Sequence, residues 1–271
     1  MGFRKKLKKK ICEYLLNKGI FTSKKTDLKK IDRFLNMVHP ESLNIENIRI
    51  GGDNDGGYII PNDLNGIKYC FSPGVGTLSK FEQELTKKNI KCFLADFSVN
   101  PKFENNLIDF EKKFIGASTY DNYFTLKDWI SQKVDYNKNN DLLLQIDIEG
   151  DEYSVINALD EETIKKFRII LIEFHQLHYL FDDYMFEKIN DAFKKILKFF
   201  YCSHIHPNND VDFIFKEQNI IIPPVLEFSF LRKDRGKILD NELSFPSKID
   251  QPNNSKKRDI ILPKCWYKPV N

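Results

Sequence analysis

The fold of this chain is decided by the stretch Cys70-Phe71-Ser72-Pro73-Gly74-Val75-Gly76. An apolar strand over 67–72 ends in it, two glycines turn the chain, and a run with helical periodicity follows over 77–88. Glycine allows a backbone to approach a ligand closely and to take a positive φ. Ligands of doubly wound sheets bind at the carboxyl ends of the strands. The stretch therefore predicts a strand, a ligand-binding turn and a helix.

The same alternation of strand and helix continues after this turn. Strands are expected at 90–97, 113–116, 141–148 and 167–174, with helices at 77–88, 125–132, 152–159 and 184–198. Three more strands, at 199–205, 211–215 and 225–232, follow without helices between them. This order predicts an α/β fold with a mostly parallel sheet and an antiparallel edge. A glycine- and aspartate-rich loop within 48–61 predicts a hairpin before the sheet.

Three segments are expected along the chain. Residues 1–44 form a basic helical extension with helices at 4–18 and 27–38, and residues 45–235 form the main α/β domain. Residues 236–271 are rich in Pro, Asn, Lys and Asp. This composition predicts an irregular tail, which we expect to pack on the core through Trp266 and Tyr267.

Composition excludes several classes of protein. The 271 residues are 41% hydrophobic and 30% charged, enough apolar material for one substantial core. No apolar run is long enough to cross a bilayer, and the basic start leads into too short and polar a segment for a secretory signal. Five scattered cysteines without a C-x-x-C pair favour reduced thiols. A cytoplasmic location is therefore expected.

Charge is unevenly distributed along the chain. Residues 1–30 hold eleven Lys and Arg against Glu13 and Asp27, a balance of +9, so the other 241 residues carry −6 of the total of +3. An acidic main body is a poor surface for nucleic acid. The basic start fits either a solvated helix face or peripheral contact of residues 1–20 with an anionic membrane.

An acidic residue follows the glycine turn at a sequence spacing that is typical of ribose-binding residues. Asp96 ends the next expected strand, 22 residues after Gly74, where a carboxylate can accept both hydroxyls of a ribose. The turn and Asp96 together predict a cofactor of the adenosine type. Ser79 stands where a dinucleotide fingerprint needs a third Gly or Ala, which weakens the alternative of a nicotinamide cofactor.

Polar side chains gather at the ends of three later strands. The stretches are Gln145-Ile146-Asp147-Ile148-Glu149-Gly150-Asp151-Glu152, Ile172-Glu173-Phe174-His175 and His204-Ile205-His206-Pro207-Asn208-Asn209-Asp210. Asp151 and Glu152 fit the N-terminus of the next helix equally well. The other groups predict a polar pocket at the carboxyl edge of the sheet. Two mechanisms stay open: a histidine that removes a proton, or Asp147, Glu173 and a histidine that hold a divalent cation.

Taken together, these motifs resemble the FkbM-type S-adenosylmethionine-dependent methyltransferases over roughly residues 45–232. The resemblance rests on Arg49–Tyr58, the turn Phe71–Gly76 with Phe81-Glu82, Asp96, Ile146–Glu152, Ile172–His175 and His204–Asn209. It implies the Rossmann-like class I methyltransferase fold, with a seven-stranded sheet and an antiparallel edge strand. It also implies S-adenosylmethionine as cofactor and a hydroxyl of a sugar, lipid or polyketide-like product as acceptor.

The resemblance also implies roles for individual residues. The expected cofactor-binding residues are Gly74 and Gly76 at the methionine part, Asp96 at the ribose, Asp55, Gly57 and Tyr58 on the other side, and Ser72 and Glu82. Ser72-Pro73 departs from the family, because many methyltransferases carry an acid before the turn; Glu82 or Asp53 would then meet the amino group. The expected acceptor-side residues are His175 as general base, Asp147 and Glu149 as orienting groups, and Glu173, His206 and Asn208 as substrate contacts. Asp147 and Glu173 are also the expected ligands of a divalent cation, Mg²⁺ or Mn²⁺.

The predicted activity is O-methyl transfer to a sugar, either a nucleotide-activated sugar or a precursor of surface polysaccharide or capsule. Two alternatives remain. One is a nicotinamide-dependent oxidoreductase of nucleotide sugars. The other is a non-catalytic peripheral membrane module, which leaves the acid and histidine cluster unexplained. The expected partner is a small-molecule sugar substrate.

Overall fold

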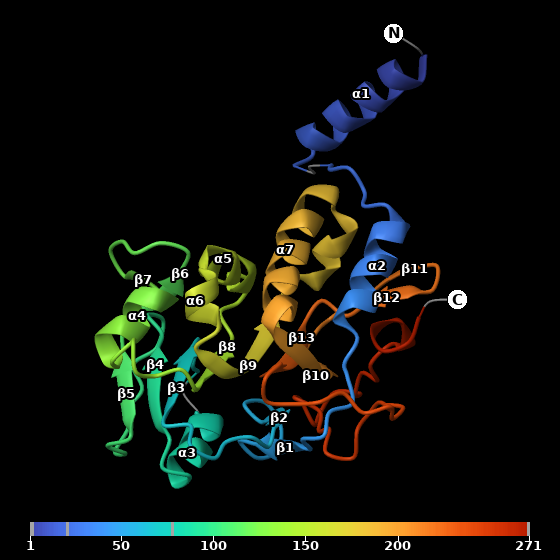
Figure 1. The fold of residues 1–271 in the computed structure, drawn as a ribbon. Helices are drawn as coiled ribbons and strands as arrows, with labels where there is room; N and C mark the ends of the chain where they lie inside the picture. Colours follow the sequence, from blue (N-terminus) through green and yellow to red (C-terminus); the bar gives the residue numbers. More distant parts are fainter. Residues whose placement is uncertain (1–2, 20–21, 77–78, 270–271) are drawn as a thin grey trace.

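A computed structural model describes residues 3–19, 22–76 and 79–269 of the chain. Within these residues a seven-stranded sheet has the order β10-β13-β9-β8-β3-β4-β5 (Figure 1). Its strands are β3 (Tyr69–Pro73), β4 (Lys91–Ala95), β5 (Ile108–Glu111), β8 (Leu142–Ile146), β9 (Phe167–Phe174), β10 (Phe200–Pro207) and β13 (Leu226–Arg232). β13 runs antiparallel to both neighbours and the remaining pairs are parallel. The predicted mostly parallel seven-stranded fold is confirmed, with the reversed strand one position in from the edge.

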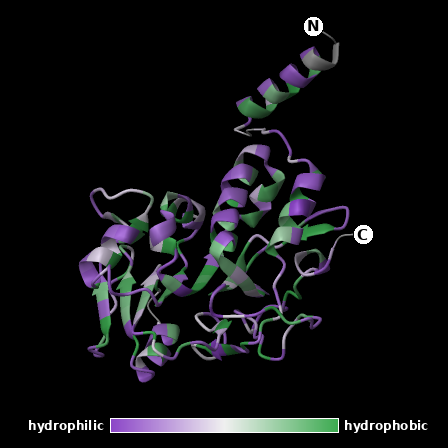
Figure 2. Cartoon of the chain, viewed as in Figure 1, coloured by the Kyte–Doolittle hydropathy of each residue, from purple (hydrophilic) through white to green (hydrophobic). Residues whose placement is uncertain are grey.

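Helices and a hairpin cover the two faces of this sheet (Figure 1). One face packs against α2 (Leu28–Val38), α4 (Leu126–Lys133), α5 (Glu152–Ala158) and α7 (Asp183–Phe199). The other packs against α3 (Lys80–Lys87) and the hairpin of β1 (Asn47–Ile50) and β2 (Tyr58–Pro61). Alternate residues of β8 divide between the faces, with Leu144 on the first and Leu143 on the second. Burial on both faces explains why the central strands are almost uniformly apolar (Figure 2).

The ends of the larger helices follow from local capping. The Asp27 carboxylate accepts a hydrogen bond from the backbone N–H of Lys29 at the start of α2, and Thr125 accepts one from Asp128 at the start of α4. Asp182 accepts from two backbone N–H groups at the start of α7. These side chains satisfy donors that the first turn of a helix leaves unpaired.

The structure corrects several expected elements. Residues 211–214 are not a strand, and 212–215 are exposed; β11 (Phe215–Glu217) and β12 (Ile220–Ile222) form a separate hairpin there. The expected strand at 113–116 becomes β6 (Phe114–Gly116), which pairs with β7 (Tyr123–Thr125) outside the main sheet. β5 takes the outer place instead. A short apolar run does not indicate whether a segment will join the main sheet. Here β6 and β11 pair outside it.

The remaining elements lie at the ends and between the main ones. They are α1 (Phe3–Asn17), α6 (Glu161–Ile164) and the 3₁₀ turns η1 (Leu177–Phe181) and η2 (Lys264–Trp266). The first part of the expected helix at 77–88, Thr77 and Leu78, lies outside the described residues. α1 projects away from the body of the molecule (Figure 1). None of the helices in the described ranges is both long and apolar enough to span a bilayer.

The C-terminal tail packs onto the body. Trp266 is fully buried, with its ring 6.4 Å from that of Phe34 in α2 and 6.0 Å from that of Phe228 in β13. Within the tail, the ring centroids of Phe245 and Tyr267 lie 5.0 Å apart. A large aromatic side chain buried this way fixes a tail in which η2 is the only helix or strand among the described residues.

Candidate active site

The glycine turn after β3 is shaped by the strand beside it. Gly74 has a φ of +80°, and its N–H donates a hydrogen bond to the carbonyl oxygen of Ala95 at 3.0 Å. A Cβ at Gly74 would lie 1.5 Å from the carbonyl oxygen of Asp147, whereas a Cβ at Gly76 would meet no described atom within 4 Å. Gly74 is therefore required by the close approach of β3 and β8, and Gly76 leaves open space.

We expect Gly74→Ala to lower the free energy of unfolding by about 2–4 kcal/mol, because both the positive φ and the contact with Asp147 oppose a Cβ. Urea unfolding followed by circular dichroism measures this. Gly76→Ala is the matched control and should change stability by less than about 0.5 kcal/mol. Equal losses in the two variants would contradict the structural role of Gly74.

A cavity of about 400 Å³, here called the turn cavity, opens beside this turn. Its described lining comes from the β1–β2 loop, the turn, the start of α3 and the end of β8: Asn54, Asp55, Gly56, Tyr58, Gly74, Val75, Gly76, Ser79, Lys80, Phe81, Glu82, Gln145 and Asp147. A cleft of this size at the carboxyl ends of parallel strands is where α/β folds bind small ligands.

Buried polar groups lie beneath the turn cavity. The Ser72 hydroxyl contacts the carboxylate of Glu82 and lies 2.6 Å from Oε1 of Gln145. All three side chains are buried, and Glu82 and Gln145 reach the cavity wall. Burial raises the pKa of Glu82, and the hydrogen bond from Ser72 opposes that rise. A ligand that presents a cation here would meet a carboxylate shielded from water.

A second cavity, here called the acidic cavity, has a volume of about 330 Å³. Its described lining is Asp55, Asp147, Glu149, Glu173, His175, Asn208, Asp210, Val211, Val225 and Asn253. Asp55 and Asp147 line both cavities. The two spaces therefore adjoin at these carboxylates, so that a ligand in one can face a ligand in the other.

His175 lies among carboxylates at the end of β9. Its Nδ1 is 3.1 Å from Oε1 of Glu152, and its Nε2 is 3.5 Å from Glu149 and 3.8 Å from both Asp147 and Glu173. Burial opposes the protonated ring, but the hydrogen bond to Glu152 and the negative charge of Glu173 outweigh it and raise the pKa of His175 to about 9. The ring is therefore a cation at neutral pH.

Two carboxyls of the acidic cavity hold protons unusually well. Burial and the charge of Glu173 raise the pKa of Asp147 well above its usual range. Burial and the charge of Glu227 raise the pKa of Glu173 to about 8. Oδ1 of Asp147 and Oε2 of Glu173 are buried and lack a hydrogen-bond partner in the described structure. Orphaned buried acceptors are rare in native structures, and two of them beside carboxyls of perturbed pKa are consistent with a functional site.

The turn between β8 and α5 presents this acidic group. Glu149 has a φ of +58°, uncommon for a side chain with a Cβ, and Gly150 one of +115°. Oε1 of Glu152, which is fully buried, accepts hydrogen bonds from the N–H groups of Ile148 and Gly150 at 3.2 and 3.0 Å. Glu152 thus fixes the conformation of the turn and the orientation of His175. The sequence did not indicate this role, because an acidic residue is also common at the start of a helix.

The structure brings most of the expected residues to the two cavities. Gly74, Gly76, Asp55, Tyr58 and Glu82 line the turn cavity, and Asp147, Glu149, Glu173, His175 and Asn208 line the acidic cavity. Asn208 donates a hydrogen bond to Oε1 of Glu173 at 2.8 Å. The strand ends meet there because parallel strands place their carboxyl ends on one edge.

Four expected residues do not line either cavity among the described residues. Asp96 instead accepts hydrogen bonds from the N–H and hydroxyl of Ser98. Ser72 is buried beneath the side chains that line the turn cavity. Gly57 closes the hairpin, since a Cβ there would lie 2.1 Å from the carbonyl oxygen of Gly52. His206 points toward Asp250 of the tail, because it shares a face of β10 with His204.

Sequence reasoning missed several lining residues. Gln145 and Ser79 stand next to recognised motifs, and their position at a strand end and a helix start was the available signal. Asn253 comes from the irregular tail, where nothing in the sequence indicates a site. One grouping that could hold a cation includes a residue that was not among the expected ligands. Asp147, Glu149 and His175 each offer an atom within 4.8 Å of the others, so Glu149 joins the expected Asp147 and histidine as a candidate ligand.

Comparisons with known proteins bear on the class of this chain. Residues 82–205 match the family model described as the methyltransferase FkbM domain, and no curated protein matches the chain significantly. Among solved structures, the chain is similar to one in the crystal structure of a fibrillarin/Nop5p complex, at 12% identity and a TM-score of 0.38, over 62% of this chain and 74% of that one. That likeness is weak, and the fold assignment rests on the strand order. The matched residues 82–205 include β4, β8, β9 and most of α3 and β10, so the match to the FkbM methyltransferase domain, a family that uses S-adenosylmethionine, covers the centre of the sheet.

Proposed function

We propose that this chain transfers a methyl group from S-adenosylmethionine to a hydroxyl of a sugar. The observation that carries the proposal is the meeting of the turn cavity and the acidic cavity at Asp55 and Asp147. Methyl transfer needs the acceptor oxygen and the methyl carbon held in line, and two adjoining cavities supply that alignment. The family match supports the methyltransferase class, and the choice of oxygen and sugar is our inference.

The turn cavity fits the cofactor. Its buried Glu82 carboxylate suits the amino group of the methionine part, and it would supply from α3 the acid that is missing at Ser72-Pro73. Gly76 leaves room beside it, and Asp55 and Tyr58 close the opposite side. Bound there, S-adenosylmethionine supplies an electrophilic methyl group.

The acidic cavity favours an uncharged acceptor with hydroxyl groups. Five carboxyls line it, from Asp55, Asp147, Glu149, Glu173 and Asp210, against the single cation of His175. Carboxyl oxygens accept hydrogen bonds from hydroxyls, and the carboxyls that are ionised repel phosphates at close range. Of the two sugar classes expected from the sequence, a sugar unit of a polysaccharide precursor is therefore preferred over a nucleotide-activated sugar.

Asp147 is the proton acceptor that this arrangement favours. A histidine with a pKa of about 9 is already protonated at neutral pH and is a poor base there. Asp147 borders both cavities, and its Oδ1, which has no hydrogen-bond partner among the described residues, is free to take a proton from the acceptor hydroxyl when the carboxyl is ionised. His175 then acts as a positioning residue. The positive charge of its protonated ring offsets the repulsion between the neighbouring carboxylates.

A divalent cation at Asp147, Glu149 and His175 is the second mechanism. It is favoured by the 4.8 Å grouping of their ligand atoms. Mg²⁺ or Mn²⁺ there would lower the pKa of the acceptor hydroxyl directly. Activity that is lost in EDTA and restored by Mg²⁺ would assign this role to the metal. Unchanged activity in EDTA would assign it to Asp147.

The test of the function combines binding and turnover. Calorimetry should give binding of S-adenosylhomocysteine and none of NAD(P), and radiolabelled S-adenosylmethionine should label neutral oligosaccharides more than nucleotide sugars. Tight NAD(P) binding alone would favour an oxidoreductase. Liposome binding that is lost on deleting residues 1–20, with no methyl transfer to any extract, would favour a membrane module.

A further inference from the structure

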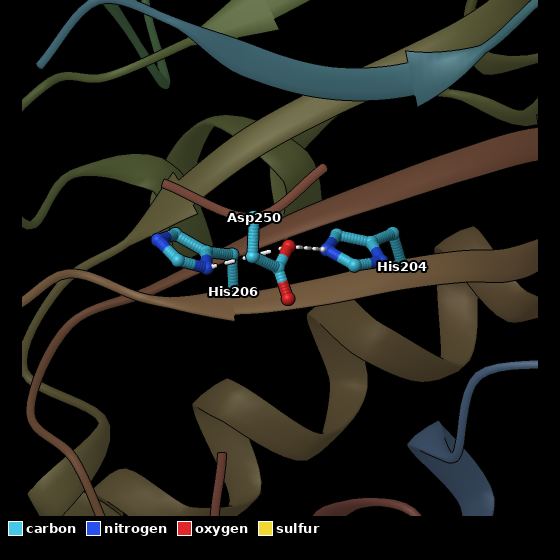
Figure 3. Close-up of side chains that lie close together, drawn as sticks. All are labelled: His204, His206 and Asp250. Carbon is cyan, nitrogen blue, oxygen red and sulfur yellow. Dashed lines mark hydrogen bonds and ion pairs between the residues drawn. The ribbon is translucent and has the colours of Figure 1, made fainter. Parts of the chain in front are cut away.

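A second group of metal-binding side chains lies away from both cavities. His204 and His206 are two residues apart on β10 and face Asp250 of the C-terminal tail, as Figure 3 shows. Oδ1 of Asp250 is 2.8 Å from Nε2 of His204 and 3.6 Å from Nδ1 of His206. Three ligand atoms, one from each residue, lie within 4.8 Å of one another. None of the three residues is in the described lining of either cavity.

This group is buried and incompletely paired. The side chains of His204, His206 and Asp250 are 6%, 4% and 3% exposed. Asp250 accepts one further hydrogen bond, from the N–H of Ser247 to Oδ2 at 2.6 Å. His206 lies beyond hydrogen-bond distance from Asp250, with its Nδ1 facing Oδ1 of that carboxylate. Two imidazole nitrogens therefore face one buried carboxylate oxygen, and only that of His204 is within hydrogen-bond distance of it.

We propose that His204, His206 and Asp250 bind one Zn²⁺ ion. Two imidazoles and a carboxylate are a donor set that zinc takes in proteins, whereas Mg²⁺ prefers oxygen ligands. Ligands at about 2.0 Å from a tetrahedral ion lie about 3.3 Å apart. The distances of 2.8 and 3.6 Å bracket that value, so small rotations of the side chains complete the site.

The position of the site indicates a structural role. β10 belongs to the sheet and Asp250 to the irregular tail, so the ion would join two segments about 45 residues apart. Asn253, three residues after Asp250, lines the acidic cavity and donates a hydrogen bond to Glu227 at 2.6 Å, and its carbonyl oxygen accepts one from the N–H of Asp55 at 2.9 Å. The ion would therefore fix the tail segment that forms one wall of the acceptor side.

The experiment uses the full chain, stripped with EDTA and titrated with Zn²⁺ alone against a chromophoric chelator. We expect one high-affinity ion per chain, and at least about a 100-fold loss of affinity in His206→Gln and in Asp250→Asn. His178→Gln is the control for a half-buried histidine elsewhere, and Glu149→Gln is the control for the acidic cavity. Both controls should bind Zn²⁺ as the unchanged chain does.

Two further measurements use the unchanged chain, so they do not depend on whether the variants fold. Replacement of Zn²⁺ by Co²⁺ in the unchanged chain should give the visible absorption of a tetrahedral nitrogen and oxygen site, and Zn²⁺ should raise the melting temperature. No binding of Zn²⁺ by the unchanged chain would overturn the proposal. So would affinity that His206→Gln leaves intact, or that Glu149→Gln removes.

Discussion

Replacement of Asp147 by Asn is expected to lower kcat for methyl transfer by at least about 100-fold, the usual contribution of a positioned general base. Asn keeps the shape of the side chain but cannot take a proton. Binding of S-adenosylhomocysteine should change by less than about threefold, roughly 0.7 kcal/mol, because the backbone contacts of the turn are unaltered. Steady-state kinetics and calorimetry measure the two effects separately.

Two neighbouring variants test whether the effect belongs to Asp147. Glu149→Gln alters a carboxylate of the same turn that is 86% exposed, and it should cost less than about tenfold in kcat. His175→Gln removes the cation that favours ionised Asp147, so the rise of kcat with pH should move to higher pH. If His175→Gln instead loses as much kcat as Asp147→Asn, with no such shift, His175 is the base that the sequence predicted.

The sheet was predictable from sequence because its central strands are buried on both faces. β9 matches the expected range 167–174, since all eight of its residues are buried and the apolar run Ile169–Ile172 at its centre is typical of a strand covered on both faces. Partly exposed elements were less predictable. β5 has no fully buried residue, and its sequence resembles a loop as much as a strand. The apolar residues Phe213 and Ile214 suggest a strand but remain exposed.

The site was predictable where it depends on topology and not where it depends on distant contacts. Asp147 and His175 come together because both follow parallel strands that lie side by side. Asn253 reaches the acidic cavity because the tail returns across the sheet, a path that no local pattern encodes. The charge of His175 was also hidden, because it depends on carboxyls from several segments, Glu152 above all.

Glu227 sets the direction in which pH changes the stability of the fold. Burial, opposed by the hydrogen bond from Asn253, raises the pKa of Glu227 from 4.5 to about 8. Between these values the folded chain holds a proton that the unfolded chain has lost, so stability falls as pH rises. At about 1.4 kcal/mol for each pKa unit, the loss from pH 5 to pH 8 is about 3–5 kcal/mol. Glu173 acts in the same direction.

The variant Glu227→Gln should therefore be more stable than the unchanged chain at pH 8.5 and close to it at pH 5. The amide oxygen still accepts the hydrogen bond from Asn253, while the cost of a buried anion is gone. Urea unfolding at both pH values measures the difference, with Glu104→Gln as the control at an exposed glutamate. An equal fall in stability with pH for Glu227→Gln and the unchanged chain would show that Glu227 ionises freely in the folded state.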